Sequence, residues 1–252
     1  EKKLAEHGIK FFLLERRRSF EVGKFRKLIK FLKEERVEII HSHLLGSNFW
    51  AGVIGRLARV PIVVVHNHGE SYNSKVKISV NKLIGILADQ IIFISQYEMS
   101  TFIKRIGCAP DKCVTIYNGI KEGDYNNRPI DDMKISLGIS STNHVIGIVA
   151  AFRPEKDHRT FLLAAREVLK RIGGVTFLLV GDGKTKKDME KFASDLGISE
   201  NCLFAGFQEE ISGFLSIMDI GCLSSIREGI PLSILEYMAF SLPIVATSVG
   251  GV

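Results

Sequence analysis

Short, continuously apolar runs alternate with longer segments of helical periodicity along the whole chain. The expected strands are 11–14, 37–41, 61–65, 90–94, 114–117, 145–150, 176–180, 201–205, 220–223 and 244–246. The periodicity between them predicts helices at 24–35, 47–58, 76–88, 96–106, 159–171, 184–196 and 231–240. Apolar strands separated by helices are typical of parallel sheets that are covered on both faces. The pattern therefore predicts an α/β protein.

A polar stretch at 121–143 interrupts this alternation, with a short helical piece near 133–137. Half of the expected strands precede it and half follow. We therefore interpret 128–143 as a linker between an N-terminal domain, 1–127, and a C-terminal domain, 144–252. Two such halves predict two Rossmann-like domains whose parallel sheets face a cleft. Because ligands of open parallel sheets bind beyond the strand carboxyl ends, we expect function in the loops after strands.

The composition fits a globular protein that stays in a reducing compartment. The 252 residues are 46% hydrophobic and 25% charged, which suffices for a sizeable core. No apolar run approaches the roughly 18 residues of a membrane-spanning helix, and no signal-peptide pattern follows Glu1. The cysteines lack zinc-type spacing, so we expect free thiols and a cytoplasmic location. They are Cys108, Cys113, Cys202 and Cys222.

The net charge of +6 comes mostly from the N-terminal end of the chain. Within 20–35, Phe25, Leu28, Ile29 and Leu32 form an apolar stripe surrounded by Lys and Arg. Such a helix fits peripheral contact with an anionic membrane, on its inner face, or a domain helix that packs its stripe inward. Because exposed aromatic residues do not interleave with the basic ones, a nucleic-acid interface is disfavoured.

Two carboxylates follow the expected strand 220–223. Pro231 fits the first turn of a helix, and the free amides there suit an anion or a hydroxyl group. Glu236 lies four residues from Leu232 and from Phe240, so we expect it on a buried helix face. A buried carboxylate such as Glu236, or its neighbour Glu228, needs donors. Ligand hydroxyls or a cation from another loop would supply them.

Phosphate-binding chemistry is suggested by three further loops. Arg153 and Lys156 follow a strand, where a guanidinium fork and a mobile ammonium suit a diphosphate; the alternative is a solvated charged turn. The glycine turn at 181–183 lacks the third glycine of a dinucleotide fingerprint, which disfavours an oxidoreductase. Gly250 and Gly251 would bring backbone amides close to a phosphate.

Histidines follow two expected strands of the first half. They are His41, His43, His66 and His68. Zinc is one explanation of this grouping, but only Glu70 adds a carboxylate nearby, so we expect no metal. We favour a polar site in which one histidine serves a substrate hydroxyl, with a structural role for each as the alternative.

In their order along the chain, these loops resemble the retaining glycosyltransferases of family 4, which are two-domain enzymes of the GT-B class. The resemblance rests on the Pro-Glu-Lys loop at 154–156, the turn at 180–183, the strand end at 204–206, the spacing of Glu228 and Glu236, and the terminal glycine pair. Residues 116–120 resemble the end of the family's first domain. The resemblance covers nearly the whole chain and implies a GT-B fragment that lacks both ends.

The resemblance also implies residue roles. Lys156 would bind the donor diphosphate, Glu236 the ribose hydroxyls and Glu228 the donor sugar, while His68 would lie near the reacting sugar. The donor site would be completed by Gly229, Ile230, Pro231, Leu232, Gly250 and Gly251. The arginine expected at position 151 is Ala151 here. We expect Arg153 to replace it, because residues two apart in an extended segment face the same side.

The implied reaction moves a sugar from a nucleotide-sugar to an acceptor hydroxyl and retains the anomeric configuration. Glu228, Lys156 and His68 would be the catalytic residues, and no metal or other cofactor is expected. The acceptor would be a glycan, a lipid-linked sugar or a small molecule, in polysaccharide, glycolipid or cell-envelope glycan synthesis. The alternatives are a sugar-nucleotide 2-epimerase of similar fold and a non-catalytic sugar-nucleotide-binding subunit.

Overall fold

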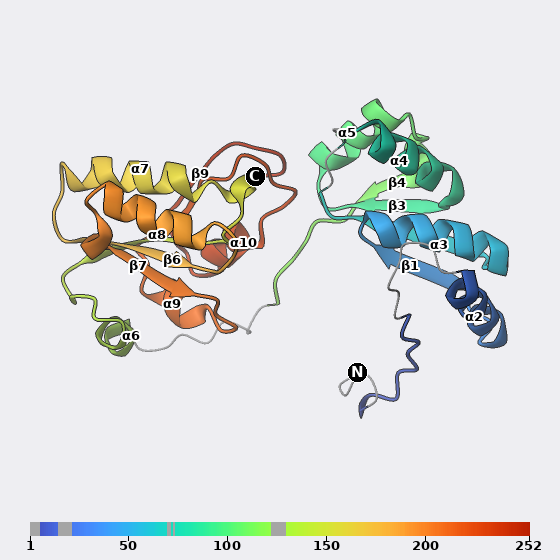
Figure 1. Ribbon diagram of the computed structural model, residues 1–252, viewed down its shortest axis with the longest axis horizontal. Helices are drawn as coiled ribbons and strands as arrows, with labels where there is room; N and C mark the ends of the chain where they lie inside the picture. The colour runs from blue at the N-terminus through green and yellow to red at the C-terminus, as the bar shows by residue number, and fades with distance from the viewer. Residues whose placement is uncertain (1–5, 15–21, 70–71, 73, 122–129) are drawn as a thin grey trace. The chain divides into compact units, whose positions relative to one another are not determined.

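The structure is a computed structural model that describes residues 6–14, 22–69, 72, 74–121 and 130–252. The chain divides into two compact units, Glu1–Ile116 and Tyr117–Val252. Each unit is a parallel sheet with helices packed on it (Figure 1). The α/β class and the two parallel sheets expected from the sequence are confirmed.

The first unit contains a four-stranded parallel sheet in the order β1-β2-β3-β4. Its strands are β1 Ile39–His43, β2 Ile62–Asn67, β3 Gln90–Phe93 and β4 Cys113–Thr115, and its helices include α2 Val22–Glu34, α3 Leu45–Ala58, α4 Lys75–Leu87 and α5 Gln96–Ile106, with a 3-10 turn, η1, at Pro110–Lys112. Val63, Val65, Ile91 and Phe93 alternate inward and form a core with Phe102 of α5. The sheet thus buries the apolar positions that predicted its strands.

The second unit contains a five-stranded parallel sheet in the order β7-β6-β5-β8-β9. Its strands are β5 His144–Val149, β6 Val175–Val180, β7 Cys202–Gly206, β8 Ile220–Leu223 and β9 Ile244–Ala246. Its helices are α6 Ile130–Ser136, α7 His158–Leu169, α8 Lys186–Asp195, α9 Ser212–Ser216 and α10 Leu232–Ala239, with 3-10 turns η2 Pro154–Lys156 and η3 Ser199–Asn201. The chain builds outward from β5 on one side through β6 and β7, then returns to its other side with β8 and β9.

The strand expected at residues 11–14 was a wrong prediction. The structure has no strand there, and Phe11, Phe12 and Leu13 are exposed. Phe12 instead stacks on Phe31 of α2, with ring centroids 5.3 Å apart. An apolar run needs a neighbouring edge to become a strand, and among the described strands β1 pairs only with β2.

The segment interpreted as a linker is partly built into the second unit. Residues 122–129 lie outside the described part of the chain, but the expected short helix is present as α6. After it, Ile139 is buried with Val145 and Leu215 in an apolar cluster. The polar composition of this segment did not reveal that it has apolar anchors on the second sheet. The five-residue helix α9 was also not expected, because it is too short for a periodic pattern.

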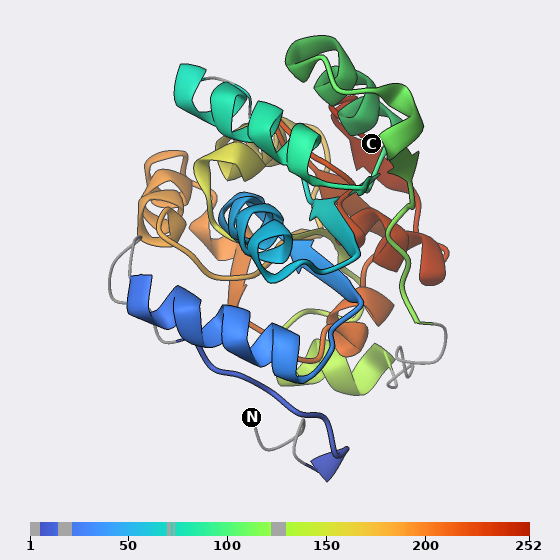
Figure 2. The same cartoon turned by 90° about the vertical axis from the view of Figure 1, so that its right-hand side faces the viewer.

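Helix α2 packs its apolar stripe inward. Phe25 is buried and stacks on Trp50 of α3, with ring centroids 4.1 Å apart. In Figure 2 these two helices lie side by side on the first unit. Packing against α3 therefore explains why position 25 is apolar, and membrane contact is not needed for that. Within the described residues, no helix has both the length and the apolar character needed to cross a bilayer.

The expectation of free cysteine thiols is confirmed. Cys108, Cys113, Cys202 and Cys222 are all unpaired and half-buried. Burial raises the pKa of Cys202 and of Cys222 to about 11. These thiols therefore stay protonated at neutral pH and behave as small apolar side chains.

Stability of the second unit should fall as the pH is lowered, because of His158. Burial beneath Phe152, on which the imidazole stacks at 4.0 Å, lowers the pKa of His158 to about 4 from 6.5. Between these two values the unfolded chain binds more protons than the folded chain, so the free energy of unfolding decreases as pH falls from about 7 to about 4. Urea unfolding at several pH values measures this slope.

The variant His158→Phe is the matched comparison, since an apolar ring keeps the stack but cannot be protonated. We expect a shallower decline of the unfolding free energy in this variant. The slope that remains would include His66 of the first unit, whose pKa burial also lowers to about 4. Identical slopes in the two proteins would contradict the assignment to His158.

Candidate functional site

The loops after β5 and β8 meet where the strand order of the second sheet reverses. After β5 the chain goes to β6 on one side, and after β8 it goes to β9 on the other side, so the two connections diverge and open a crevice at the carboxyl end of the sheet. A pocket of about 970 Å³ lies there. Its lining includes Ala151, Lys156, Asp182, Glu228 and Glu236. The pocket lies wholly within the second unit.

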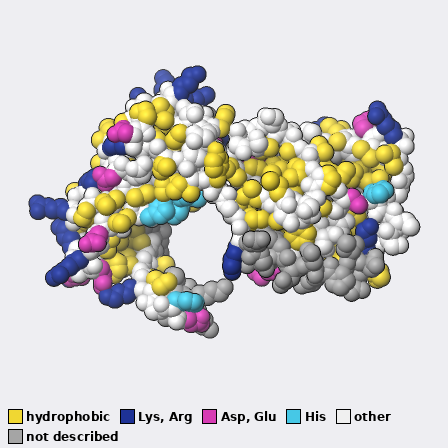
Figure 3. All heavy atoms as spheres, turned by 180° about the vertical axis from the view of Figure 1, so that it is seen from behind, with side chains coloured by type: hydrophobic (Ala, Val, Ile, Leu, Met, Phe, Trp, Pro, Cys, Tyr) yellow, Lys and Arg dark blue, Asp and Glu magenta, His cyan; other side chains and the backbone are white. Residues whose placement is uncertain are grey.

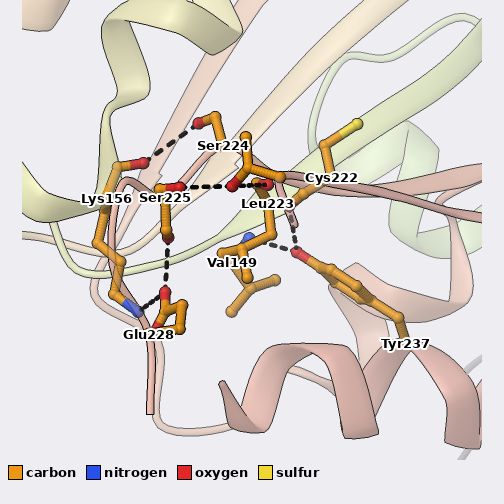
Figure 4. A network of polar contacts seen from close by, with 9 residues as sticks. Val149, Lys156, Cys222, Leu223, Ser224, Ser225, Glu228 and Tyr237 are labelled. Carbon is orange, nitrogen blue, oxygen red and sulfur yellow. Dashed lines mark hydrogen bonds and ion pairs between the residues drawn. The ribbon is translucent and has the colours of Figure 1, made fainter. Parts of the chain in front are cut away.

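Lys156 and Glu228 form an ion pair at this point. Lys156 Nζ lies 2.6 Å from Glu228 Oε1, and the two side chains are 22% and 8% exposed. Ser225 Oγ donates a second hydrogen bond to the same carboxylate oxygen, at 2.5 Å. Figure 4 shows the two charged side chains reaching toward each other from separate loops. The sequence analysis gave a cation from another loop as one possible partner of the buried carboxylate. The structure has such a partner for Glu228, and it is Lys156.

Direct hydrogen bonds join the two loops that carry this pair. Ser224 Oγ donates to the carbonyl oxygens of Lys156 and Asp157, at 3.1 and 2.8 Å. The Ile226 N–H donates to the Glu155 carbonyl at 2.9 Å. These bonds fix the backbone on both sides, so the ammonium and the carboxylate are held in position by more than their mutual attraction.

The segment after β9 supports the Glu228 loop from a third side. Thr247 Oγ1 donates to the Ser225 carbonyl. Gly250 has φ +60°, and a Cβ at this position would overlap the Glu228 carbonyl oxygen. Gly250 therefore packs against the loop, whereas the sequence predicted an amide close to a phosphate. Neither Gly250 nor Gly251 is among the described residues that line the pocket.

Tyr237 is a supporting residue that the sequence analysis did not identify. Its hydroxyl donates to the Cys222 carbonyl at 3.1 Å and accepts the Val149 N–H at 2.8 Å. Burial raises its pKa, so the phenol stays protonated. A Cβ on Gly221 would lie 2.6 Å from the ring. That mid-strand glycine was the available signal, since glycine in a strand often marks close approach by another group.

Glu236 lies at the pocket but is only half-buried. The prediction that Glu236 lies on a buried helix face was partly wrong, because Leu232 on the same face is 47% exposed. The lining also includes Ile230, Pro231 and Leu232, but not Gly229. Glu228 is therefore the more buried carboxylate, and Glu236 is the one with access to the pocket from α10.

The structure does not bring Arg153 to the pocket. Arg153 is exposed, and it is not among the described lining residues. Its N–H donates to the Ala151 carbonyl at 2.8 Å, which closes a tight turn. This turn at Phe152 interrupts the extended segment on which the expectation rested, and Ala151 lines the pocket whereas Arg153 does not.

The glycine turn at 181–183 approaches protein backbone closely. Gly181 has φ +141° and Gly183 has φ +153°, and a Cβ at either would overlap a carbonyl oxygen, of Ala150 or Phe152 respectively. The Phe152 N–H in turn donates to the Asp182 carbonyl at 2.9 Å. These glycines let the loops after β5 and β6 pack together, and Gly181 and Asp182 still reach the pocket lining.

The histidines of the first unit gather at the ends of β1 and β2. His43 pairs in register with His66, and the two-residue period puts His41 on the same face. Ligand atoms of these three lie within 4.8 Å of one another. His43 Nδ1 lies 2.8 Å from His68 Nε2. Glu70, the one carboxylate that the sequence placed nearby, lies outside the described residues.

Burial disfavours the protonated form of three of these rings, His41, His66 and His68. Burial, followed by the charges of His68, His43 and His41, lowers the pKa of His66 to about 4. Burial and the neighbouring imidazoles also lower the pKa of His41 and of His68. Both ring nitrogens of His66 lack a hydrogen-bond partner among the described residues.

Comparison with known families accounts for both halves of the chain. Residues 1–123 match the family described as Glycosyltransferase Family 4, and residues 129–252 match the family described as Glycosyl transferases group 1. A crystal structure of Anabaena Alr3699/HepE in complex with UDP-glucose superposes with a TM-score of 0.85, at 23% identity over 99% of this chain and 70% of that one. The two parallel sheets thus define the GT-B class of glycosyltransferase folds.

Within that class, the chain belongs to the group 1 glycosyltransferases with a family 4 first half. UDP-Gal:alpha-D-GlcNAc-diphosphoundecaprenol alpha-1,3-galactosyltransferase of Escherichia coli is 29% identical, over 89% of this chain and 61% of the relative. N-acetyl-alpha-D-glucosaminyl L-malate synthase of Bacillus anthracis is 24% identical, over 92% of this chain and 62% of the relative. The chain therefore spans about three fifths of the length of these relatives.

Gly250→Ala should destabilise the second unit, because the new Cβ meets the Glu228 carbonyl at a positive φ. We expect a loss of about 2–4 kcal/mol in the free energy of unfolding. Urea denaturation measures it.

Gly173→Ala is the control, since nothing lies within 4 Å of a Cβ there. Its stability should stay within about 1 kcal/mol of the unmodified chain. Equal stability of the two variants would show that Gly250 does not support the Glu228 loop.

Proposed function

We propose that this chain is the nucleotide-sugar-using core of a retaining glycosyltransferase that acts in cell-envelope glycan synthesis. The observation that carries the proposal is the Lys156–Glu228 pair at the edge of the pocket, where the second sheet reverses its strand order. Membership of the group 1 and family 4 glycosyltransferases supports it.

In this proposal Lys156 binds the donor diphosphate. An ammonium group has three N–H donors, and the contact with Glu228 uses one of them. The others are available for phosphate oxygens in the pocket. As the sugar leaves, negative charge builds on the diphosphate, and a fixed ammonium in a partly desolvated site stabilises that charge without a metal ion.

Glu228 then contacts the donor sugar, and Glu236 binds the ribose hydroxyls. A carboxylate is a strong acceptor for hydroxyl groups, and both residues line the pocket. Glu228 Oε1 already accepts bonds from Lys156 and Ser225, so Oε2 is the oxygen we assign to the sugar. Ile230, Pro231 and Leu232 close the same side of the pocket, near the start of α10.

His68 is the residue we assign to the reacting sugar and the acceptor. Its ring is exposed and lies against His43. The donor nucleotide we propose is a uridine diphosphate, since HepE was crystallised with UDP-glucose. The acceptor is a lipid-linked or glycan hydroxyl, by analogy with the Escherichia coli relative. Thermal-shift measurements with UDP-, GDP- and ADP-sugars test the nucleotide.

Lys156→Met and Glu228→Gln should each lower turnover of the full-length protein by about 100-fold or more. Both substitutions keep the approximate side-chain size, so the loss reflects charge. Arg153→Ala is the matched control, because this exposed cation lies in the same loop but outside the described pocket lining. Its donor affinity should stay close to that of the unmodified chain.

Removal of one member of a buried pair also destabilises the fold, by about 3–5 kcal/mol, because the other charge stays buried without its partner. The double variant Lys156→Met with Glu228→Gln removes both charges, so it should be more stable than Lys156→Met alone. Donor titration by calorimetry on the double variant separates lost binding from lost folding. Near-normal turnover in either single variant would refute the assignment.

A further inference from the structure

The proposed function gives no role to three histidines of the first unit, His41, His43 and His66. They form a cluster beside His68, which is assigned above to the reacting sugar. Figure 3 shows a band of histidine side chains together at the surface of this unit. The three rings come from two adjacent strands, and their placement follows from the register of β1 with β2.

The geometry of the cluster is close to that of a zinc site. A tetrahedral zinc ion with Zn–N bonds of about 2.0–2.1 Å holds its ligand nitrogens roughly 3.3 Å apart. Here the three candidate nitrogens already lie within 4.8 Å of one another. His41 and His43 are exposed, so small rotations of their side chains can close this difference.

The polar atoms of the cluster also fit a cation. His66 has both ring nitrogens buried and without a hydrogen-bond partner among the described residues. A buried polar atom without a partner is costly, and a metal ion offers compensation. His43 Nδ1 bonds to His68 Nε2. When His43 Nδ1 donates its proton to His68 Nε2, the other ring nitrogen of His43, Nε2, is left to bind a metal ion. Hydrogen bonds of this kind orient many metal-bound histidines.

The backbone beneath the cluster is fixed. Asn48 of α3 donates to the His66 carbonyl at 3.0 Å, and its own oxygen accepts from Ser42 of β1 at 2.8 Å. Both side chains are buried. This link between the two strand ends holds their spacing, so a metal ion would bind to a largely formed site.

We propose that His41, His43 and His66 form a zinc-binding site. Neutral imidazoles suit Zn²⁺, and the shared face of the strands supplies three of them. A three-histidine site leaves a fourth position open to water or to an anionic oxygen of a ligand. The three ligands belong to the first unit and the residues that line the donor pocket belong to the second, and the zinc proposal does not depend on the function proposed above.

The test is zinc binding by the chain purified without a histidine tag, measured by equilibrium dialysis and atomic absorption. We expect one Zn²⁺ per chain, unaffected by excess Mg²⁺. The double variant His41→Ala with His43→Ala should weaken binding by about tenfold or more. Both residues are exposed, so the variant should fold, and circular dichroism in the presence of a chelator confirms that it does.

His144→Ala is the matched control, since His144 is exposed and belongs to the second unit. It should bind zinc as the unmodified chain does. Substitution with Co²⁺ identifies the ligands, because thiolates add a near-ultraviolet charge-transfer band that imidazoles do not. Absence of stoichiometric zinc, unchanged affinity in the double variant, or a thiolate band from Cys108 or Cys113 would each overturn the proposal. None of these measurements requires a bound nucleotide-sugar or catalytic turnover.

Discussion

The pocket depends on one constraint, the reversal of strand order at β5. Because β6 and β8 lie on opposite sides of this strand, the loops after β5 and β8 emerge side by side and bring Lys156 to Glu228. Two charges with so little exposure are stable only when they are paired. The Ser224 bonds, the Thr247 bond and Gly250 then keep the two loops at the distance that the pair requires.

The fold followed from the sequence at most of the continuous apolar runs. The boundaries of α5 were predicted to the residue, because Ser95 caps its start and Gly107 ends it in a left-handed conformation. The run at residues 11–14 failed, since hydrophobicity alone does not provide a strand with a neighbour. The segment after residue 130 shows the opposite case, because its few apolar residues, Met133, Leu137 and Ile139, pack on the second unit although their surroundings in the sequence are polar.

The site was less predictable than the fold. Position after a strand marked Lys156, Glu228 and Glu236 as candidates, and all three line the pocket. Their expected roles came from the family resemblance and stay predictions. Position was not enough for Arg153, since one turn of backbone redirects the segment. The roles of Tyr237 and Gly250 arise from contacts between residues distant in sequence. The mid-strand Gly221 signals that some group approaches the strand closely, but no local pattern identifies Tyr237 as that group.

Tyr237 has a consequence for any effort to redesign donor preference. One phenolic hydroxyl is bonded to the backbone of both β5 and β8, and its ring fits against the bare backbone of Gly221. Helix α10, which carries Glu236, is therefore anchored to the two strands that precede the Lys156 and Glu228 loops. Exchange of a pocket side chain leaves this frame intact, whereas transplanting α10 from another enzyme succeeds only if the tyrosine and the strand glycine are transferred together.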